Sequence, residues 1–127
     1  MEKIILDTNL LMAIKELKVD IFAEIFKVCD FPYELCVLDR TIEELENLIK
    51  TSLLSKRQAS QLALKLVEAK KVKILRTHDS RHVDDILVDL GKNGAIIGTA
   101  DRELKLRLHA NKSKILTLRQ KKYIILE

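Results

Sequence analysis

Short apolar runs alternate along the chain with longer stretches in which apolar residues recur every three or four positions. Runs of the first kind favour buried strands, and recurrence of the second kind favours helices. We expect strands over 3–6, 34–38, 72–75, 94–99 and 114–118. We expect helices over 10–17, 20–28, 39–50, 84–90 and 103–109, and one that begins at Ser55. This order predicts an α/β protein with a wound, mainly parallel five-stranded sheet.

Residues that favour caps and turns set several of the boundaries. Asp20 is placed to cap the second helix, and either Asp39 or Thr41 to cap the third. Pro32 is expected to interrupt regular structure before the second strand. Gly91 is expected to end the helix over 84–90.

Three helical segments depend on how their apolar residues are spaced. The stripe of the third helix is formed by Ile42, Leu45, Leu48 and Ile49. The stripe of the helix from Ser55 is formed by Ala59, Leu62, Ala63, Leu66 and Val67, and we expect it to lie on a sheet. In 103–109, Leu104, Leu106 and Leu108 alternate as in a strand. We assign a helix there because a parallel strand that follows needs a crossover.

Composition narrows the class of protein. Apolar residues make up 47% of the chain and charged residues 33%, which predicts a soluble globule with one domain over 1–127. No run approaches the roughly 20 apolar residues that span a bilayer, so we expect no membrane segment, no signal peptide and a cytoplasmic location. Cys29 and Cys36 match neither a disulfide framework nor a zinc quartet and are interpreted as small buried residues.

Positive charge is concentrated near the end of the chain. The net charge is +4, and 102–122 holds eight Lys or Arg against one acid, Glu103. Such a segment can present charge to phosphates, although an ordinary solvated face explains it equally well.

Four acids follow the predicted strands. Asp7 comes directly after the first strand and Asp101 soon after the fourth, while Glu44 and Asp84 lie early in the helices after the second and third. In an open parallel sheet, loops at the carboxyl ends of strands converge on one rim. The order of elements therefore predicts that the four carboxylates meet there.

Carboxylates crowded together repel one another unless a cation lies between them. Mg²⁺ and Mn²⁺ take oxygen ligands and are held by a few carboxylates together with waters and substrate phosphates. Such a centre can activate water and neutralise charge on a phosphodiester. The acids thus favour metal-dependent phosphodiester hydrolysis.

Each acid also has an ordinary structural explanation. Asp7 and Asp101 could each cap the helix that follows, and Glu44 and Asp84 could be favourable acids of an early helical turn. Caps, however, have no reason to cluster on one rim.

Four motifs carry a resemblance to a known family. They are Ile4-Ile5-Leu6-Asp7-Thr8-Asn9, Ile42-Glu43-Glu44-Leu45, Val83-Asp84-Asp85-Ile86-Leu87 and Ile96-Ile97-Gly98-Thr99-Ala100-Asp101-Arg102-Glu103-Leu104. In this order and spacing they resemble the PIN-domain ribonucleases over nearly the whole chain. The resemblance implies a three-layer α/β/α fold, dependence on Mg²⁺ or Mn²⁺, and cleavage of single-stranded RNA.

The resemblance also implies roles for individual residues. The metal-binding and catalytic acids would be Asp7, Glu44, Asp84 and Asp101. The supporting residues would be the Thr99 hydroxyl, Asn9 beside the first acid, Asp85, and Glu103 acting through water. Asp84 is preferred to Asp85 because the family acid precedes an apolar residue, here Leu87, by three positions. Ala100 departs from the pattern, since many relatives carry Asn there.

With the four acids assigned to metal, 15 acids face 23 bases in the rest of the chain. We expect RNA contacts from Arg102, Lys105, Arg107, Arg119, Lys121 and Lys122. Tyr123 is the aromatic residue expected to stack on bases, because the Phe residues are predicted to lie in the core.

Three alternative interpretations remain. His78 and His82, four apart, could share a metal, but without a third ligand they are interpreted as loop residues. The chain could be a catalytically inactive PIN-like module that binds RNA or protein. It could also be an aspartyl-phosphate enzyme with Asp7 as nucleophile, although Asn9 stands where such enzymes have a second Asp.

The segment 118–123 resembles an archaeal branch akin to ribosomal RNA processing nucleases more than the toxins of toxin–antitoxin pairs. The two branches imply a ribosome-assembly partner or an antitoxin, respectively. Apolar helix surface near the N-terminus could in addition form a homodimer.

Overall fold

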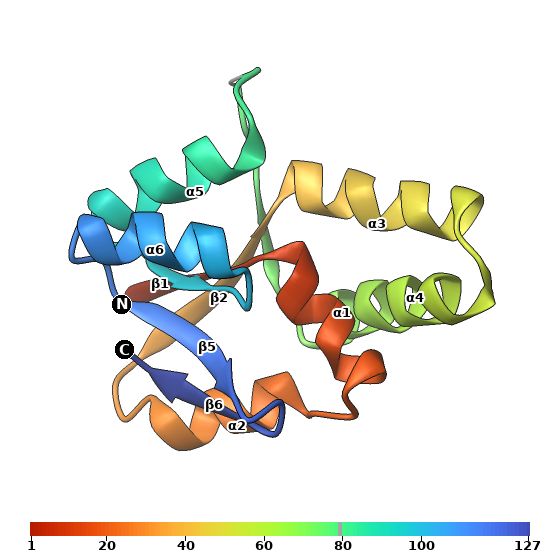
Figure 1. The fold of residues 1–127 in the computed structure, drawn as a ribbon, viewed down its shortest axis with the longest axis horizontal. Coiled ribbons are helices and arrows are strands. Elements are labelled where there is room, and N and C mark those ends of the chain that lie inside the picture. The colour runs from red at the N-terminus through yellow and green to blue at the C-terminus, as the bar shows by residue number, and fades with distance from the viewer. Residues whose placement is uncertain (79) are drawn as a thin grey trace.

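The computed structural model describes residues 1–78 and 80–127. Its elements are β1 (Glu2–Leu6), α1 (Thr8–Glu16), α2 (Ile21–Val28), β2 (Tyr33–Leu38), α3 (Asp39–Thr51), α4 (Leu54–Ala69), β3 (Lys73–Leu75), α5 (Val83–Lys92), β4 (Ile96–Gly98), α6 (Arg102–Ala110), β5 (Ile115–Arg119) and β6 (Tyr123–Leu126). They form one mixed sheet in the order β3-β2-β1-β4-β5-β6, with helices around it (Figure 1). The α/β class and the mainly parallel sheet expected from the sequence are confirmed.

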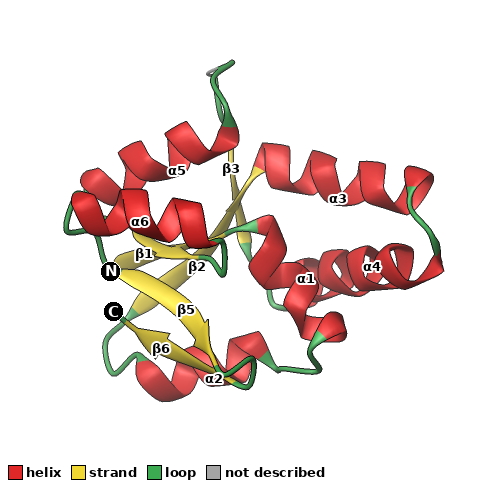
Figure 2. Ribbon diagram, in the orientation of Figure 1, coloured by secondary structure: helices red, strands yellow, loops and turns green. Residues whose placement is uncertain are grey.

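Helices cover both faces of the sheet, and the alternation of side chains in β1 explains why. Ile4 and Leu6 belong to a buried cluster with α1, α2 and α4, while Ile5 points the other way into a cluster with α5 and α6. Figure 2 shows α5 and α6 on one side of the strands and α2 on the other. Because both faces of the central strands are buried, these strands are continuous apolar runs.

The sheet has six strands, so the expected count of five is wrong. β6 pairs antiparallel with β5 through a tight turn in which the Lys122 amide donates to the Arg119 carbonyl at 3.1 Å. The two central residues, Gln120 and Lys121, both have φ of 55°. Hairpin turns of this kind usually carry Asn or Gly at such positions. Without those residues, the sequence gives no hairpin signal here.

The same turn yields a prediction about stability. Replacing Gln120→Asn and Lys121→Gly together is expected to raise the free energy of unfolding by about 1–2 kcal/mol, because left-handed backbone is costly for side chains other than Gly and Asn. Urea unfolding measures this effect, and Gln120→Ala with Lys121→Ala serves as the control that keeps the strain. A double Asn-Gly variant no more stable than the wild type would contradict it.

The helical layer differs from the expectation at α4. This helix packs mainly against α1 and α3 rather than on the sheet. Its small residues Ala59 and Ala63 are buried there, and Figure 1 shows α3 and α4 running side by side away from the strands. The apolar stripe was correctly placed, but its partner is a pair of helices.

Two boundary residues also differ from the expectation. Neither Asp39 nor Thr41 is the cap of α3: the cap position is Leu38, and Asp39 is the first helical residue. The Asp39 carboxylate instead accepts from the Thr77 hydroxyl at 2.7 Å and the Thr77 amide at 3.1 Å, which holds the chain after β3 against α3. The hydrogen bond from the Thr77 hydroxyl is the main reason that the pKa of Asp39 is lowered.

Gly91 lies inside α5 and does not close it, because the helix continues to Lys92. A Cβ at Gly91 would lie 2.9 Å from Cδ2 of Leu108 and 3.3 Å from Cγ1 of Ile97. The glycine is therefore explained by the close approach of α6 and β4 to α5.

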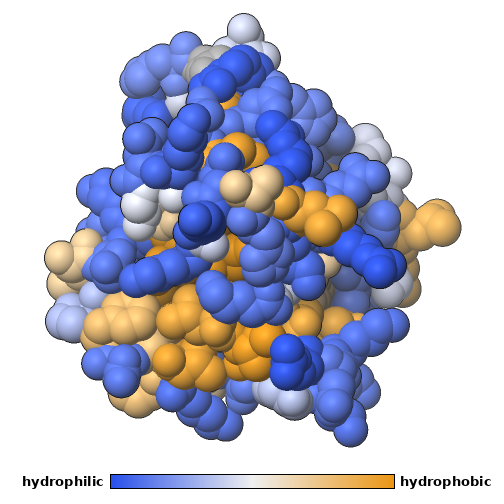
Figure 3. Space-filling view, turned by 60° about the vertical axis from the view of Figure 1, so that its left-hand side comes forward, coloured by the Kyte–Doolittle hydropathy of each residue, from blue (hydrophilic) through white to orange (hydrophobic). Residues whose placement is uncertain are grey.

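The two cysteines are buried and free, as expected. Phe26, in contrast, is 75% exposed on α2, so the prediction that the Phe residues lie in the core is wrong for this residue. Tyr123 and Leu126 on β6 are also exposed, and α2 packs against β6. Figure 3 shows apolar side chains gathered on the lower part of one face of the molecule. The homodimer through apolar helix surface near the N-terminus stays a prediction.

Within the described residues, no helix is long and apolar enough to cross a bilayer.

Candidate active site

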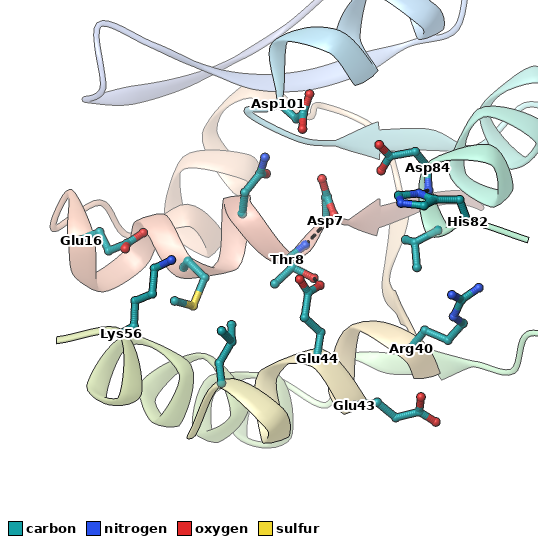
Figure 4. Close-up of a pocket in the computed structure, with 14 residues that line it drawn as sticks. Asp7, Thr8, Glu16, Arg40, Glu43, Glu44, Lys56, His82, Asp84 and Asp101 are labelled. Atoms are coloured by element: carbon teal, nitrogen blue, oxygen red, sulfur yellow. Dashed lines mark hydrogen bonds between the residues drawn. The ribbon is translucent and has the colours of Figure 1, made fainter. Parts of the chain in front are cut away.

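The four acids expected from the sequence line one cleft at the carboxyl ends of β1 and β4. The cleft has a volume of about 820 Å³. Figure 4 shows Asp7 between Asp101, Asp84 and Glu44, which come from different segments of the chain. Its lining consists of Asp7, Thr8, Asn9, Met12, Glu16, Arg40, Glu43, Glu44, Leu48, Lys56, His82, Val83, Asp84 and Asp101. Convergence at the strand ends is thus an observed property of this fold.

Asp7 is the most buried of the four acids, with 9% of its surface exposed. Its amide donates to the Gly98 carbonyl at 2.8 Å, which ties the end of β1 to the end of β4. One carboxylate oxygen, Oδ1, accepts from the Thr8 amide at 2.7 Å. The other, Oδ2, accepts from the Thr99 hydroxyl at 2.9 Å. The cap of α1 considered from the sequence is therefore real, and it leaves Asp7 at the cleft.

Burial raises the pKa of Asp7 from 3.8 to about 6. The hydrogen bonds from Thr99 and Thr8 counteract this rise, and the charges of Asp84 and Glu44 add to it. Carboxylates with a raised pKa in a cleft are common at functional sites. The cost of ionising Asp7 would fall if positive charge entered the cleft.

The Thr99 side chain connects Asp7 with Asp101. Its hydroxyl donates to Asp7 and accepts from the Asp101 amide at 3.0 Å. Asn9 lies next to this link, and its Oδ1 accepts from the Ala100 amide at 3.2 Å and is 3.3 Å from the Thr99 hydroxyl. Asn9 therefore contacts the loop after β4, which carries Thr99 and Asp101, rather than Asp7 itself.

Glu44 reaches the cleft from the second turn of α3. Its Oε1 accepts from the Thr8 hydroxyl at 2.7 Å, although Glu44 itself is exposed. This contact joins α3 to the start of α1. Thr8 was not among the residues singled out from the sequence, although its position beside Asp7 was the signal that could have found it.

Asp84 lines the cleft from the first turn of α5, whereas its neighbour Asp85 does not. Asp85 Oδ1 accepts from Arg107 Nη2 at 2.7 Å in an exposed ion pair. His82 precedes them as the cap of α5: its Nδ1 is 3.4 Å from the Asp84 amide. His82 also lines the cleft, whereas the sequence predicts for it only a place in a loop.

Asp101 is both the N-cap of α6 and part of the cleft lining. Its Oδ1 accepts from the Leu104 amide at 3.0 Å and so caps α6, and its side chain also lines the cleft. Capping uses one carboxylate oxygen and leaves the other free to face the cleft. Glu103, two residues further on, is exposed and is not part of the lining.

The donor chemistry of the cleft fits a hard divalent cation. Four carboxylates supply oxygen atoms only, and burial already penalises the charge on Asp7. Among residues 1–78 and 80–127, however, no group of three or more His, Cys, Asp or Glu side chains is arranged to hold a metal ion. Oxygen donors of this kind suit cations such as Mg²⁺, which are usually bound through one or two carboxylates and keep several waters.

The basic residues expected to bind RNA lie elsewhere. The lining of the cleft does not include Arg102, Lys105, Arg107, Arg119, Lys121, Lys122 or Tyr123. Its cationic residues are instead Arg40 and Lys56, which sequence analysis did not identify. Their positions in α3 and α4 gave no signal because each stands among ordinary surface residues of an amphipathic helix.

Comparison with known proteins supports the interpretation of the motifs. A model of the PIN-like domain family matches residues 4–121. Ribonuclease VapC4 of Methanocaldococcus jannaschii is 30% identical over 125 residues, which make up 97% of this chain and 95% of that protein. The structure of the PIN domain endonuclease Utp24 is similar with a TM-score of 0.77 and 23% identity, over 98% of this chain and 90% of that one.

The likeness to Utp24 supports the fold, and the two sequence matches extend over almost the whole chain. The chain therefore belongs to the PIN-like domain family, which its four motifs resemble.

Proposed function

We propose that this chain is a divalent-metal-dependent endoribonuclease that hydrolyses phosphodiester bonds of single-stranded RNA. The observation that carries the proposal is the convergence of Asp7, Glu44, Asp84 and Asp101 on one cleft. Membership of the PIN-like domain family and the likeness to Ribonuclease VapC4 support the same reaction class. Mg²⁺ or Mn²⁺ is the proposed cofactor, because all four side chains are oxygen donors.

Each acid has a distinct part in this proposal. A bound cation would supply Lewis acidity and an activated water for attack on phosphorus. Asp7 would hold it from the buried floor of the cleft, in an orientation fixed by Thr8 and Thr99. Asp84, Asp101 and Glu44 surround this floor and would orient its water ligands. No side chain needs to act as a nucleophile.

Thr99 and Thr8 are the supporting residues in the proposal. Thr99 fixes the Asp7 carboxylate relative to the loop that carries Asp101, and Thr8 fixes Glu44. Asp85 and Glu103, which the resemblance placed in supporting roles, are not given such roles here, because they lie outside the cleft lining.

The proposal is tested by comparing two aspartates of the same helix. Asp84→Asn is expected to reduce cleavage of an unstructured RNA with Mn²⁺ by roughly 10–100-fold, the usual cost of losing a residue that orients a metal centre. Asp89→Asn is the matched control, because Asp89 pairs with Arg81 at the surface and does not line the cleft. Cleavage is measured on labelled RNA with Mn²⁺, with Mg²⁺, and with EDTA.

The wild-type chain is expected to cleave with either cation and not with EDTA. Absence of cleavage by the wild type under all conditions, together with retained RNA binding, would favour the inactive module. Cleavage that persists in EDTA would overturn metal dependence. Roles in ribosomal RNA processing or as a toxin, with a ribosome-assembly partner or an antitoxin, stay predictions.

A further inference from the structure

The cleft contains cations as well as acids. Arg40 and Lys56 line the same cavity as the four carboxylates. Figure 4 shows Lys56 on one side of the acids, near Glu16, and Arg40 on the other side, below His82. An enzyme whose acids bind metal still has to hold the phosphates on either side of the bond that is cut, and cations at the edges of the cleft are suited to this task.

Lys56 is available for such a contact. It lies in the first turn of α4 and is exposed to solvent. Within the described residues, its ammonium group makes no ion pair and no hydrogen bond. The backbone at this point is fixed, because the Lys56 carbonyl accepts from the buried Ser60 hydroxyl at 2.9 Å. A lysine on a fixed helix, facing an acidic cleft without a partner of its own, can accommodate an anion that arrives with the substrate.

Arg40 is held in place by a different contact. Its Nη1 donates to the Arg81 carbonyl in the segment before α5. This segment is also anchored to the start of α3 by the two hydrogen bonds from Thr77 to Asp39. A guanidinium has five N–H donors, so one backbone contact leaves others free for a phosphate. The half-buried Arg40 is thus oriented before any substrate binds.

The rest of the lining points to contacts with the phosphate backbone. Its described residues include no Phe or Tyr, and its apolar members are Met12, Leu48 and Val83. Stacking on bases is the usual source of affinity for single strands besides charge. Tyr123, the aromatic residue expected to stack, lies on β6 and outside this lining. Binding in the cleft therefore has to come mainly from charge.

From this arrangement, and resting on the nuclease function proposed above, we propose that Lys56 and Arg40 are substrate-positioning residues that contact backbone phosphates on opposite sides of the scissile bond. The nucleic acid strand then crosses the cleft between Lys56 at the start of α4 and Arg40 at the start of α3. It does not run along α6 and the β5–β6 turn, where the basic sequence segment lies. Recognition of this kind reads the backbone and not the bases.

The test is RNA binding without metal, so that cleavage does not interfere. Fluorescence anisotropy of a short labelled unstructured RNA is measured in EDTA over a series of salt concentrations. Lys56→Gln and Arg40→Gln are each expected to weaken binding roughly fivefold to tenfold. Each is also expected to reduce the slope of the logarithm of the binding constant against the logarithm of the salt concentration by about 0.7, the value for one lost phosphate contact on a single strand. Lys65→Gln is the matched control, an exposed lysine of the same helix outside the cleft.

Arg40 also contacts a backbone carbonyl, so its replacement can disturb the segment before α5. Arg40→Lys keeps the charge without the full set of donors, and it is expected to restore the salt dependence of the wild type. A melting curve for each variant excludes unfolding as the cause of weaker binding.

Two results would overturn the proposal. One is wild-type affinity and salt dependence in both Lys56→Gln and Arg40→Gln. The other is a loss confined to a variant with Arg119→Gln and Lys121→Gln, which would place the RNA on the β5–β6 turn. Because binding is measured without metal, either result leaves the nuclease function to be decided by the cleavage assay on the wild-type chain.

Discussion

Asp7→Asn is expected to reduce RNA cleavage on the order of a thousandfold, the loss seen when one preorganised electrostatic group is removed from an active site. Asp7 is the most buried acid of the cleft and lies at its centre. Asparagine has nearly the same shape and still accepts from the Thr8 amide through its oxygen. The variant therefore removes a negative charge and leaves the fold intact. Single-turnover cleavage with Mn²⁺ measures the effect.

Asp20→Asn is the matched control for this variant. Asp20 also caps a helix, accepting from the Ala23 amide at 3.1 Å, but it is exposed at the start of α2 and away from the cleft. The Asp20→Asn variant is expected to cleave RNA at the wild-type rate. Cleavage by Asp7→Asn within a few-fold of the wild-type rate would refute the central role of Asp7.

The same variant is expected to be more stable than the wild type at neutral pH without metal. The pKa of Asp7 is about 6 in the folded protein and 3.8 in the absence of the fold. The folded state consequently binds this proton more tightly, and the free energy of unfolding falls as the pH rises from about 4 to 6. Above that window the full penalty is about 3 kcal/mol, since one pKa unit corresponds to about 1.4 kcal/mol.

Urea unfolding in EDTA, at a series of pH values, measures this penalty. Asp7→Asn should gain up to about 3 kcal/mol over the wild type at pH above 6, and the gain should shrink toward pH 4. Adding Mn²⁺ should then stabilise the wild type more than the variant, because a bound cation offsets the charge. A variant less stable than the wild type at all pH values would show that the hydrogen bonds of the carboxylate outweigh its burial.

Much of the site could be predicted because it follows from the topology of a parallel sheet. Strand ends in such a sheet lie at one rim, so acids placed just after apolar runs, such as Asp7 and Asp101, had to come close together. Asp84 was chosen over Asp85 from the spacing of a motif, and the structure places Asp84 in the cleft and Asp85 in an ion pair with Arg107. The local helix caps were also within reach of sequence reasoning.

What could not be predicted depends on packing between distant segments. Gly91 has the local pattern of a helix end, and only the close approach of α6 and β4 explains why a glycine lies within the helix. Arg40 and Lys56 are ordinary residues of helix surfaces until the tertiary fold turns them toward the acids. The strand β6 was missed because its turn uses residues that seldom adopt left-handed backbone.

The contacts of the Thr99 hydroxyl have a consequence for how the cleft responds to its ligands. A single side chain at the end of β4 is bonded to Asp7 at the end of β1 and to the amide of Asp101. Two carboxylates from opposite halves of the chain are thus aligned by the protein alone. Little reorganisation energy has to be spent when a ligand arrives, because the floor of the cleft is assembled as part of folding and shares the rigidity of the central strands.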